Sequence, residues 1–346
     1  MARQGHIRSM SGWVNRLWFA LEYNDLHSLR HLLQHGVNVN HVFKNVGFQR
    51  NSQTALFISV SKNSRDAVRE LLRHGADLEH CDMWGETPLF VAVRRGKLTM
   101  IKFLVEAGAN VNHMNAKGET VLFLSIRWGR KDLVDYFISQ GISVDTVNKS
   151  DSTPLVLAFE LLATGLSKTS TNTRRRAPSN IQDIIERLIP VCHNLNRQLL
   201  FKGSVLWLSL NTETAHSPNN LHFSRLLLQH GARPDKLFFL RFGGLNATTS
   251  RPNSEFFTRE FFSLAQRAGA VLQKEKTWLM TVLQEMPQEL QPYEDLFREL
   301  LAQSMNPMSL QTLTVIVIRR VLGGRLWSKI DRLPLPSQII DLLKLK

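Results

Sequence analysis

Two residue types recur along the first half of the chain with one fixed period, and this regularity limits the possible folds more than any other feature. Four threonines stand 33 residues apart, at Thr54, Thr87, Thr120 and Thr153. Three glycines keep the same spacing, at Gly75, Gly108 and Gly141. Sequence periods of about 20 to 50 residues are typical of proteins built by stacking one supersecondary unit. A single unit cannot bury its apolar face, so several units must stack in sequence order.

Each period has the same internal order. The clearest units are residues 82–112 and 115–145, and each places Gly-x-Thr before a short apolar segment, a glycine break, an amphipathic segment and a closing glycine. In Thr87-Pro88-Leu89 and Thr153-Pro154-Leu155, the threonine can cap a helix and the proline can sit in its first turn, where the missing N–H costs nothing. The closing glycines can take the left-handed conformation that ends a second helix.

This order of elements at a period of 33 resembles the ankyrin repeat. The resemblance covers roughly residues 13–235 and predicts an all-α fold, a solenoid of about six repeats. The first repeat, residues 13–40, is expected to carry a polar outer cap. The fifth begins at Asn148 and carries an insertion at about 164–180 before a helix at 181–190, and the sixth ends at Asp235. Residues 236–306 are expected to hold a degenerate seventh repeat and connecting helices.

Residues 307–346 form an apolar segment that is too short to be a stable domain alone. Seven residues fall on one helical stripe: Leu310, Leu313, Thr314, Val317, Ile318, Val321 and Leu322. Gly323-Gly324 ends that helix, and a rigid Leu333-Pro334-Leu335-Pro336 segment follows. Taken alone, such a stripe is more often an ordinary core helix, here one that would pack on the preceding repeats. The order of the two features, behind the repeats, favours a partner-binding segment.

The stretch from Ser309-Leu310 through Thr314 and Ile318 to Arg319-Arg320 resembles the first helix of a SOCS box, and a small three-helix module is expected. Together with the repeats, it resembles the ankyrin-repeat and SOCS-box family. The resemblance implies binding to elongin B/C through Leu310, Leu313, Thr314 and Ile318. It implies that Leu333, Pro334, Leu335 and Pro336 contact a cullin, type five in this family, with its RING subunit. The family usually has cysteine at the place of Thr314, which offers less apolar contact and carries a hydroxyl.

The net charge of +14 is concentrated in two segments. Residues 164–180 contribute +4, including Arg174, Arg175 and Arg176, and residues 307–346 contribute +5, which leaves +5 over the other 289 residues. A local excess of this kind argues against a nucleic-acid-binding fold. The three arginines have polar surroundings that favour a solvated loop over a nuclear-import or nucleic-acid patch or a second substrate contact.

Cysteine content and hydropathy indicate a reducing compartment. Cys81 and Cys192 are the only cysteines, which excludes a disulfide framework and suits the cytoplasm or the nucleus. The N-terminal residues lack the apolar run of a signal peptide, and no apolar stretch is long enough to predict a membrane helix.

Two tryptophans and three arginines are the candidate substrate-binding residues. Trp84 falls at the tip of a loop between repeats, and Trp128 falls at the end of a first helix in the place that Arg95 holds one repeat earlier. With Arg94 and Arg127 they are expected to line one concave patch, and exposed Trp and Arg are enriched in binding hot spots. The alternative is that each tryptophan covers a neighbouring repeat and the arginines are solvated. The cluster favours recognition of an acidic or polar protein segment.

A search for catalytic chemistry yields no active site, metal site or cofactor site. His35, His74 and His230 precede repeat glycines in matching places, so the repeat architecture accounts for them. The triplet His80-Cys81-Asp82 lacks a second Cys or His pair at zinc spacing. The leading hypothesis is a non-catalytic adaptor in which the repeats bind a substrate protein and the terminal segment recruits a ubiquitin ligase. An ankyrin scaffold outside any ligase is the alternative.

Overall fold

The computed structural model describes residues 12–43, 53–166, 180–197, 204–206, 208–209 and 222–232, with five single positions between 280 and 302. Within these residues the fold is helical, and the β structure is one isolated bridge between Phe43 and Gln53. The chain divides into two compact units, Met1–Ser150 and Asp151–Lys346. The predicted all-α class is confirmed.

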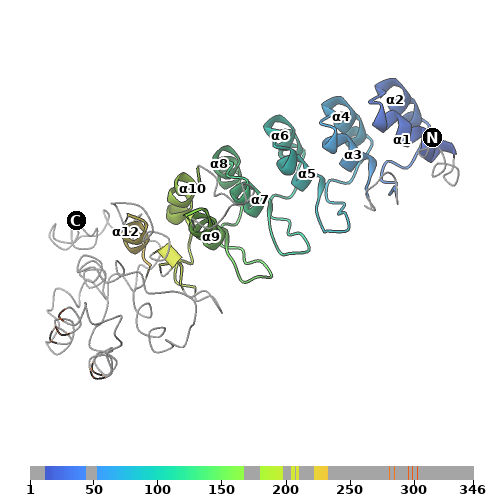
Figure 1. Cartoon of the computed structure of the whole chain (residues 1–346). Helices are drawn as coiled ribbons and strands as arrows, with labels where there is room; N and C mark the ends of the chain where they lie inside the picture. The colour runs from blue at the N-terminus through green and yellow to red at the C-terminus, as the bar shows by residue number, and fades with distance from the viewer. Residues whose placement is uncertain are drawn as a thin grey trace. The chain divides into compact units, whose positions relative to one another are not determined.

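The first unit consists of four pairs of short antiparallel helices in chain order (Figure 1). The pairs are α1 (Gly12–Glu22) with α2 (Leu26–Gln34), α3 (Ala55–Ser61) with α4 (Arg65–Arg73), α5 (Pro88–Arg95) with α6 (Leu98–Glu106), and α7 (Val121–Arg127) with α8 (Lys131–Ser139). Loops that we call finger loops, at residues 74–87, 107–120 and 140–150, follow the last three pairs and project from the helices (Figure 1). This is the arrangement that the 33-residue period predicts.

Threonine precedes the first helix of the second to fifth repeats, although only part of the predicted capping is present. Thr54 has an extended backbone and its side chain accepts a hydrogen bond from the Phe57 N–H. The Thr153 hydroxyl accepts one from the Val156 N–H at 3.3 Å. Thr87 takes the same N-cap conformation before Pro88, but its hydroxyl makes no such bond, so the predicted side-chain cap at this position is wrong. Thr87 therefore contributes to the helix start through its backbone conformation.

The second helices end as the closing glycines predict. Gly108 has a φ of +100°, and its N–H donates to the Val105 carbonyl at 3.0 Å. The next N–H, from Ala109, donates to the Leu104 carbonyl at 3.0 Å. These two bonds form a Schellman motif, which satisfies the last helical carbonyls and needs a residue that tolerates positive φ. Gly141 has the same arrangement at the end of α8, with a φ of +75°.

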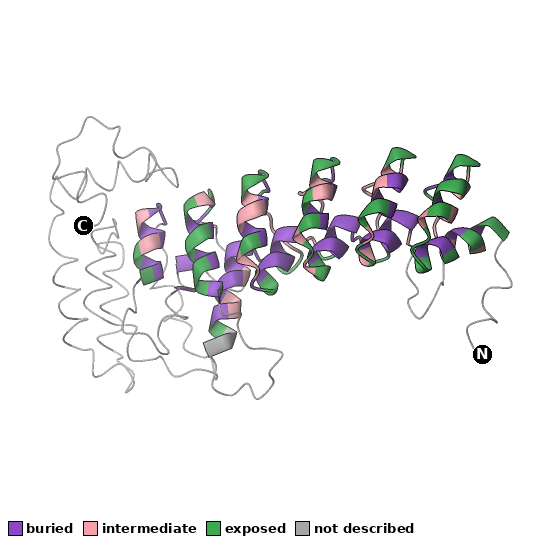
Figure 2. Cartoon of the chain, turned by 90° about the horizontal axis from the view of Figure 1, so that it is seen from above, coloured by how far each residue is buried: buried purple, intermediate pink, exposed green. Residues whose placement is uncertain are grey.

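The core of the first unit lies where the helix pairs meet. Figure 2 shows buried positions gathered on the inner sides of the helices and exposed positions on their outer surfaces. The largest side chains in this core include Phe90, Phe123 and Phe137, each fully buried. Burying one such side chain contributes roughly 1.5–3 kcal/mol. The stack is therefore held together mainly by apolar contact between adjacent pairs.

Adjacent finger loops are joined by hydrogen bonds near their tips. The Ala116 N–H donates to the Trp84 carbonyl at 2.9 Å, and the Lys149 N–H donates to the Lys117 carbonyl at 2.9 Å. Gly85 has a φ of +71°, and a Cβ at this position would lie 2.8 Å from the Ala116 nitrogen. The close approach of the two loops therefore requires glycine at position 85.

Polar side chains add a second set of links at the bases of the finger loops. Asn112 accepts from the Ser143 N–H at 2.7 Å, and Glu79 accepts from the Asn110 N–H at 2.8 Å. On the outer helices, the Arg65 guanidinium lies 5.2 Å from the Phe103 ring centroid, a cation–π contact between adjacent repeats. Each repeat thus contacts the next through its core, its loops and its outer surface.

The second unit contains α9 (Pro154–Leu166), α10 (Ile181–Leu188), the 3-10 helix η3 (Ile189–Val191) and α12 (His222–Gln229). The helix predicted at 181–190 for the fifth repeat is present, and α12 is the helix expected at the end of the sixth. Most of the insertion, the degenerate seventh repeat and the terminal helical stripe lie outside the described residues. The domain boundaries remain predictions.

Candidate functional site

The tip of the finger loop before α5 presents two large apolar side chains to solvent. Trp84 is 46% exposed and its neighbour Met83 is 59% exposed. The Asp82 carboxylate holds the turn by accepting from the Trp84 N–H and the Glu86 N–H, both at 2.9 Å. Burial raises the pKa of Asp82, and the Trp84 N–H and the positive charge of Arg94 oppose that shift. Trp84 is therefore exposed on a loop whose conformation is fixed by its own hydrogen bonds.

Two of the candidate arginines are engaged in ion pairs within their own repeats. Arg94 pairs with Glu86, which is buried. Arg127 pairs with Glu119 through two bonds, at 2.6 Å and 3.3 Å, and Glu119 is only 4% exposed. Removing one partner of such a pair leaves a buried charge uncompensated. Arg94 and Arg127 thus neutralise buried carboxylates, which is a structural role that the sequence-based interpretation missed.

A signal for these ion pairs was present in the sequence. Glu86 and Glu119 occupy the same place in successive Gly-Glu-Thr motifs, and Arg94 and Arg127 follow each of them by eight residues. A carboxylate and a cation that recur together at the period of the repeat indicate a contact made inside each repeat.

Arg95 and Trp128 differ from these arginines because both project into solvent. They occupy equivalent places 33 residues apart, Arg95 as the last residue of α5 and Trp128 just after α7. Trp128 is 61% exposed, and Arg95 is exposed and has no ion-pair partner among the described residues. The predicted patch is thus divided: Trp84 lies on the finger loop before α5, and Arg95 lies at the opposite end of that helix.

A hydrogen bond between adjacent repeats joins the segments that carry Arg95 and Trp128. The Arg130 guanidinium lies 3.4 Å from the Gly96 carbonyl oxygen, and it also binds the Asp132 carboxylate at 2.7 Å and 2.9 Å. This pairing raises the pKa of Arg130 and lowers that of Asp132. We call Arg95, Gly96, Lys97 and Trp128 the Arg95–Trp128 ridge. Arg95 adjoins Gly96, which accepts this bond, and Trp128 lies two residues before Arg130, which donates it.

Among the described residues, the histidines and Cys81 show no catalytic arrangement. His35, His74 and His230 each bond through Nδ1 to the carbonyl four residues earlier, at 2.7, 2.9 and 2.9 Å, which stabilises a helix end. Cys81 Sγ lies 3.4 Å from His113 Nε2, but burial and the nearby carboxylates, foremost that of Glu79, raise the pKa of its thiol. A protonated thiol is a poor nucleophile. No cluster of three or more potential metal ligands occurs in the part of the chain that the structure describes.

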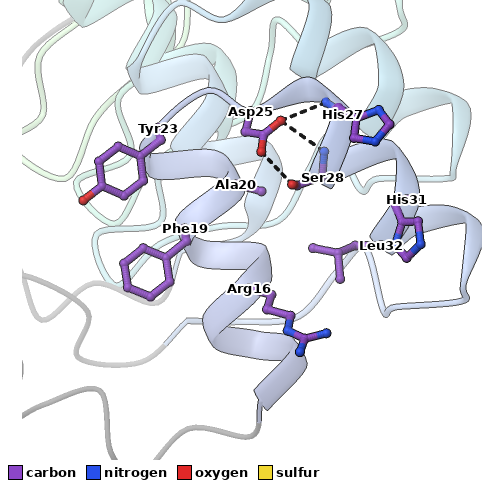
Figure 3. A pocket seen from close by; sticks show the side chains of 9 residues that line it. All are labelled: Arg16, Phe19, Ala20, Tyr23, Asp25, His27, Ser28, His31 and Leu32. Atoms are coloured by element: carbon purple, nitrogen blue, oxygen red, sulfur yellow. Dashed lines mark hydrogen bonds between the residues drawn. The ribbon is translucent and has the colours of Figure 1, made fainter.

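The outward face of the first repeat forms a hollow of about 470 Å³ between α1 and α2 (Figure 3). Phe19, Ala20 and Leu32 contribute its apolar surface, and Phe19 is 38% exposed. In the third repeat the equivalent residues, Val91, Ala92 and Leu104, are all buried. The rim is polar: Arg16, Tyr23, Asp25, His27, Ser28 and His31. The predicted polar cap is thus only partly correct, because this end keeps the apolar centre of a stacking face.

Known family models match two parts of the chain, one of which lies outside the residues that the structure describes. A family model of ankyrin repeats, in three copies, matches residues 17–115. A model of the SOCS box matches residues 306–344. The chain thus contains ankyrin repeats and a SOCS box. This is the combination of the ankyrin-repeat and SOCS-box family, which confirms the resemblance proposed from the sequence. No curated protein matches the chain.

The two modules indicate a general class of function. Ankyrin repeats with a SOCS box are the components of substrate-recognition adaptors for elongin–cullin ubiquitin ligases. A SOCS box implies binding to elongin B/C and a cullin, and it marks a non-catalytic ligase subunit. The residues expected to make these contacts, from Leu310 to Pro336, lie outside the described residues. Among the described residues, no helix has the length and apolar character needed to cross a membrane.

Proposed function

We propose that this protein is the substrate-recognition subunit of an elongin B/C–cullin–RING ubiquitin ligase. Its ankyrin repeats bind the target protein and its SOCS box recruits the ligase core. The observation that carries the proposal is the presence of both modules in one chain, at residues 17–115 and 306–344. Ubiquitin transfer then takes place on other subunits, and the chain contributes binding alone.

In the SOCS box, we assign elongin binding to Leu310, Leu313, Thr314 and Ile318. The sequence spacing predicts that these residues share one helical stripe, from which they could enter a single groove of the partner. We assign cullin binding to Leu333, Pro334, Leu335 and Pro336, and we expect a type-five cullin with its RING subunit. The proline content of this segment favours an extended conformation, which is expected to reduce the entropy lost on binding.

In the ankyrin stack, we assign substrate recognition to Trp84, Arg95 and Trp128. Large, exposed aromatic and arginine side chains on ordered backbone contribute most of the binding energy in many interfaces. Arg94 and Arg127 support this surface through Glu86 and Glu119. Their contribution to substrate binding is therefore expected to be indirect.

The test is co-expression of the tagged full-length chain with elongins B and C, followed by affinity capture and gel filtration. We expect one complex containing all three proteins, and we expect Leu310→Ser to remove both elongins because it places a hydroxyl in the apolar contact. Gln311→Ser is the matched control, since Gln311 lies on the same predicted helix but off the stripe. Equal capture of elongin C by Leu310→Ser and by the unaltered chain would refute the assignment.

A second arm of the experiment tests the cullin contact. Replacing Leu333, Pro334, Leu335 and Pro336 together by alanine should abolish cullin capture while elongins B and C remain bound. Loss of the elongins together with the cullin would show that this segment does not act as a separate cullin contact.

A further inference from the structure

We propose that the Arg95–Trp128 ridge binds one extended acidic segment of the substrate, with Arg95 contacting a carboxylate and Trp128 contacting an apolar side chain nearby. The proposal rests on the proposed function and names the chemical class that the substrate surface selects. It also separates the basic residues of this region that form ion pairs within the stack from those that are exposed and can contact a partner.

The charge distribution around the ridge is the first argument. Three of the nearby arginines are neutralised: Arg94 by Glu86, Arg127 by Glu119 and Arg130 by Asp132. Arg95 and Lys97 are exposed, and neither has an ion-pair partner among the described residues. The ridge therefore carries an uncompensated positive charge on a rigid framework, which attracts a carboxylate.

The geometry is the second argument. The bond from Arg130 to the Gly96 carbonyl ties the chain next to Arg95 to the chain next to Trp128. Helices packed side by side lie about 8–10 Å apart, so equivalent positions on α5 and α7 have about that separation. An extended segment advances about 3.3 Å per residue. In the bound segment, the residue whose carboxylate contacts Arg95 and the residue whose apolar side chain contacts Trp128 are therefore about two to four positions apart.

The finger loop before α5 argues against the main alternative partner. Exposed tryptophan and arginine side chains also suit a single-stranded nucleic acid, whose bases stack on aromatic rings. This loop lies at the other end of α5 from Arg95, carries Asp77, Glu79 and Asp82 with no lysine or arginine, and its Glu86 is already paired with Arg94. A nucleic acid that runs from the ridge along α5 to Trp84 would bring phosphates to these carboxylates, whereas a short peptide with one or two acidic residues places its charge on Arg95 alone.

Selection from a random twelve-residue peptide display library tests the proposal, with the full-length chain captured together with elongins B and C as the bait. We expect selected peptides to be enriched in Asp or Glu, with an apolar or aromatic residue two to four positions away. For a selected peptide, we expect Arg95→Gln to weaken binding about tenfold, which is the loss of one charge-assisted hydrogen bond. We expect Trp128→Ala to weaken it by at least as much.

The controls separate a specific contact from a general charge effect. Arg69→Gln removes the same charge from the outer helix α4, where Arg69 pairs with Asp66, and should leave the affinity unchanged. Replacing the acidic residue of the peptide by its amide should weaken binding to the unaltered chain and remove the difference between that chain and Arg95→Gln. Because the Arg95 side chain is exposed, this variant should keep the circular dichroism spectrum of the unaltered chain.

The proposal is overturned if no peptide is selected, if the selected peptides show no acidic preference, or if Arg95→Gln binds them as tightly as the unaltered chain. Binding of a twelve-residue oligouridine that is equally tight and equally sensitive to Arg95→Gln also overturns it, in favour of RNA. Elongin capture distinguishes this failure from failure of the proposed function. Arg95→Gln must still capture elongins B and C, whereas Leu310→Ser must lose them and still bind the peptide.

Discussion

Replacing Gly85 by alanine tests how closely adjacent finger loops pack. Two costs combine at this position. An L-residue at a φ of +71° costs about 1–2 kcal/mol, because its Cβ crowds its own backbone. The new Cβ would also lie 2.8 Å from the Ala116 nitrogen, so one loop must move and the Ala116–Trp84 hydrogen bond lengthens or breaks. Losing that bond costs about 0.5–1.5 kcal/mol, which gives a total of about 1.5–3.5 kcal/mol.

Two other glycines provide an internal calibration. Gly75 has a φ of +82° and nothing within 4 Å of a Cβ, so Gly75→Ala should cost only the backbone term of about 1–2 kcal/mol. Gly118 has a φ of +72°, and a Cβ there would lie 3.2 Å from the Lys149 nitrogen. Gly118→Ala should therefore fall between the other two. The expected order of destabilisation is Gly85, Gly118, Gly75.

The assay is urea unfolding of the full-length chain for each variant, together with hydrogen exchange of peptides that cover residues 114–118. In Gly85→Ala the Ala116 amide should exchange faster than in the unaltered chain, and in Gly75→Ala it should not change. If Gly85→Ala and Gly75→Ala cost the same within about 0.5 kcal/mol, the argument from close approach is wrong and the backbone term alone determines the effect.

Further predictions concern the core and the pH dependence of stability. Leu104→Ala should cost about 2–5 kcal/mol in urea unfolding, because it opens a cavity at a fully buried site. Leu32→Ala, at the equivalent place on the open end of the stack, should cost less than about 1 kcal/mol, and equal costs would show that this end is covered. The bond from Arg130 lowers the pKa of Asp132 from its ordinary value in the folded state, so its stabilising effect is present above the unfolded pKa of about 4 and is lost as the pH falls through the folded pKa. The difference in unfolding free energy between the unaltered chain and Asp132→Asn should therefore shrink between pH 6 and pH 3, and a constant difference would contradict the assigned ion pair.

The repeat architecture could be predicted from the sequence because it depends on local and periodic signals. Gly108 shows this well, since its spacing predicted a left-handed helix end and the structure has a Schellman motif there. The period also predicted the helix at 181–190 after the insertion, because the same helix and turn signals recur in each repeat.

Other features depend on side-chain contacts that periodicity does not specify. Thr87 occupies the predicted N-cap but its hydroxyl makes no cap bond, which depends on a rotamer and not on residue type. The partners of Arg94 and Arg127 were missed because an exposed arginine and a buried carboxylate eight residues apart do not face each other through helical spacing alone. The exposed apolar surface of the first repeat was missed because the equivalent residues are buried in the second to fourth repeats, as at Ile58, Val91 and Leu124, so the periodic pattern does not reveal that Phe19 is exposed.

The adjacent residues Arg94 and Arg95 differ in how well the stack tolerates their substitution. A substitution at Arg94 leaves the buried Glu86 without its partner and so reduces the stability of the stack. A substitution at Arg95 or Trp128 alters an exposed side chain and leaves the helix ends, the core and the bond from Arg130 in place. We therefore expect substitutions at these two positions to alter the proposed substrate surface without destabilising the scaffold. Protein engineers can use the same two positions to redirect the stack toward a chosen target.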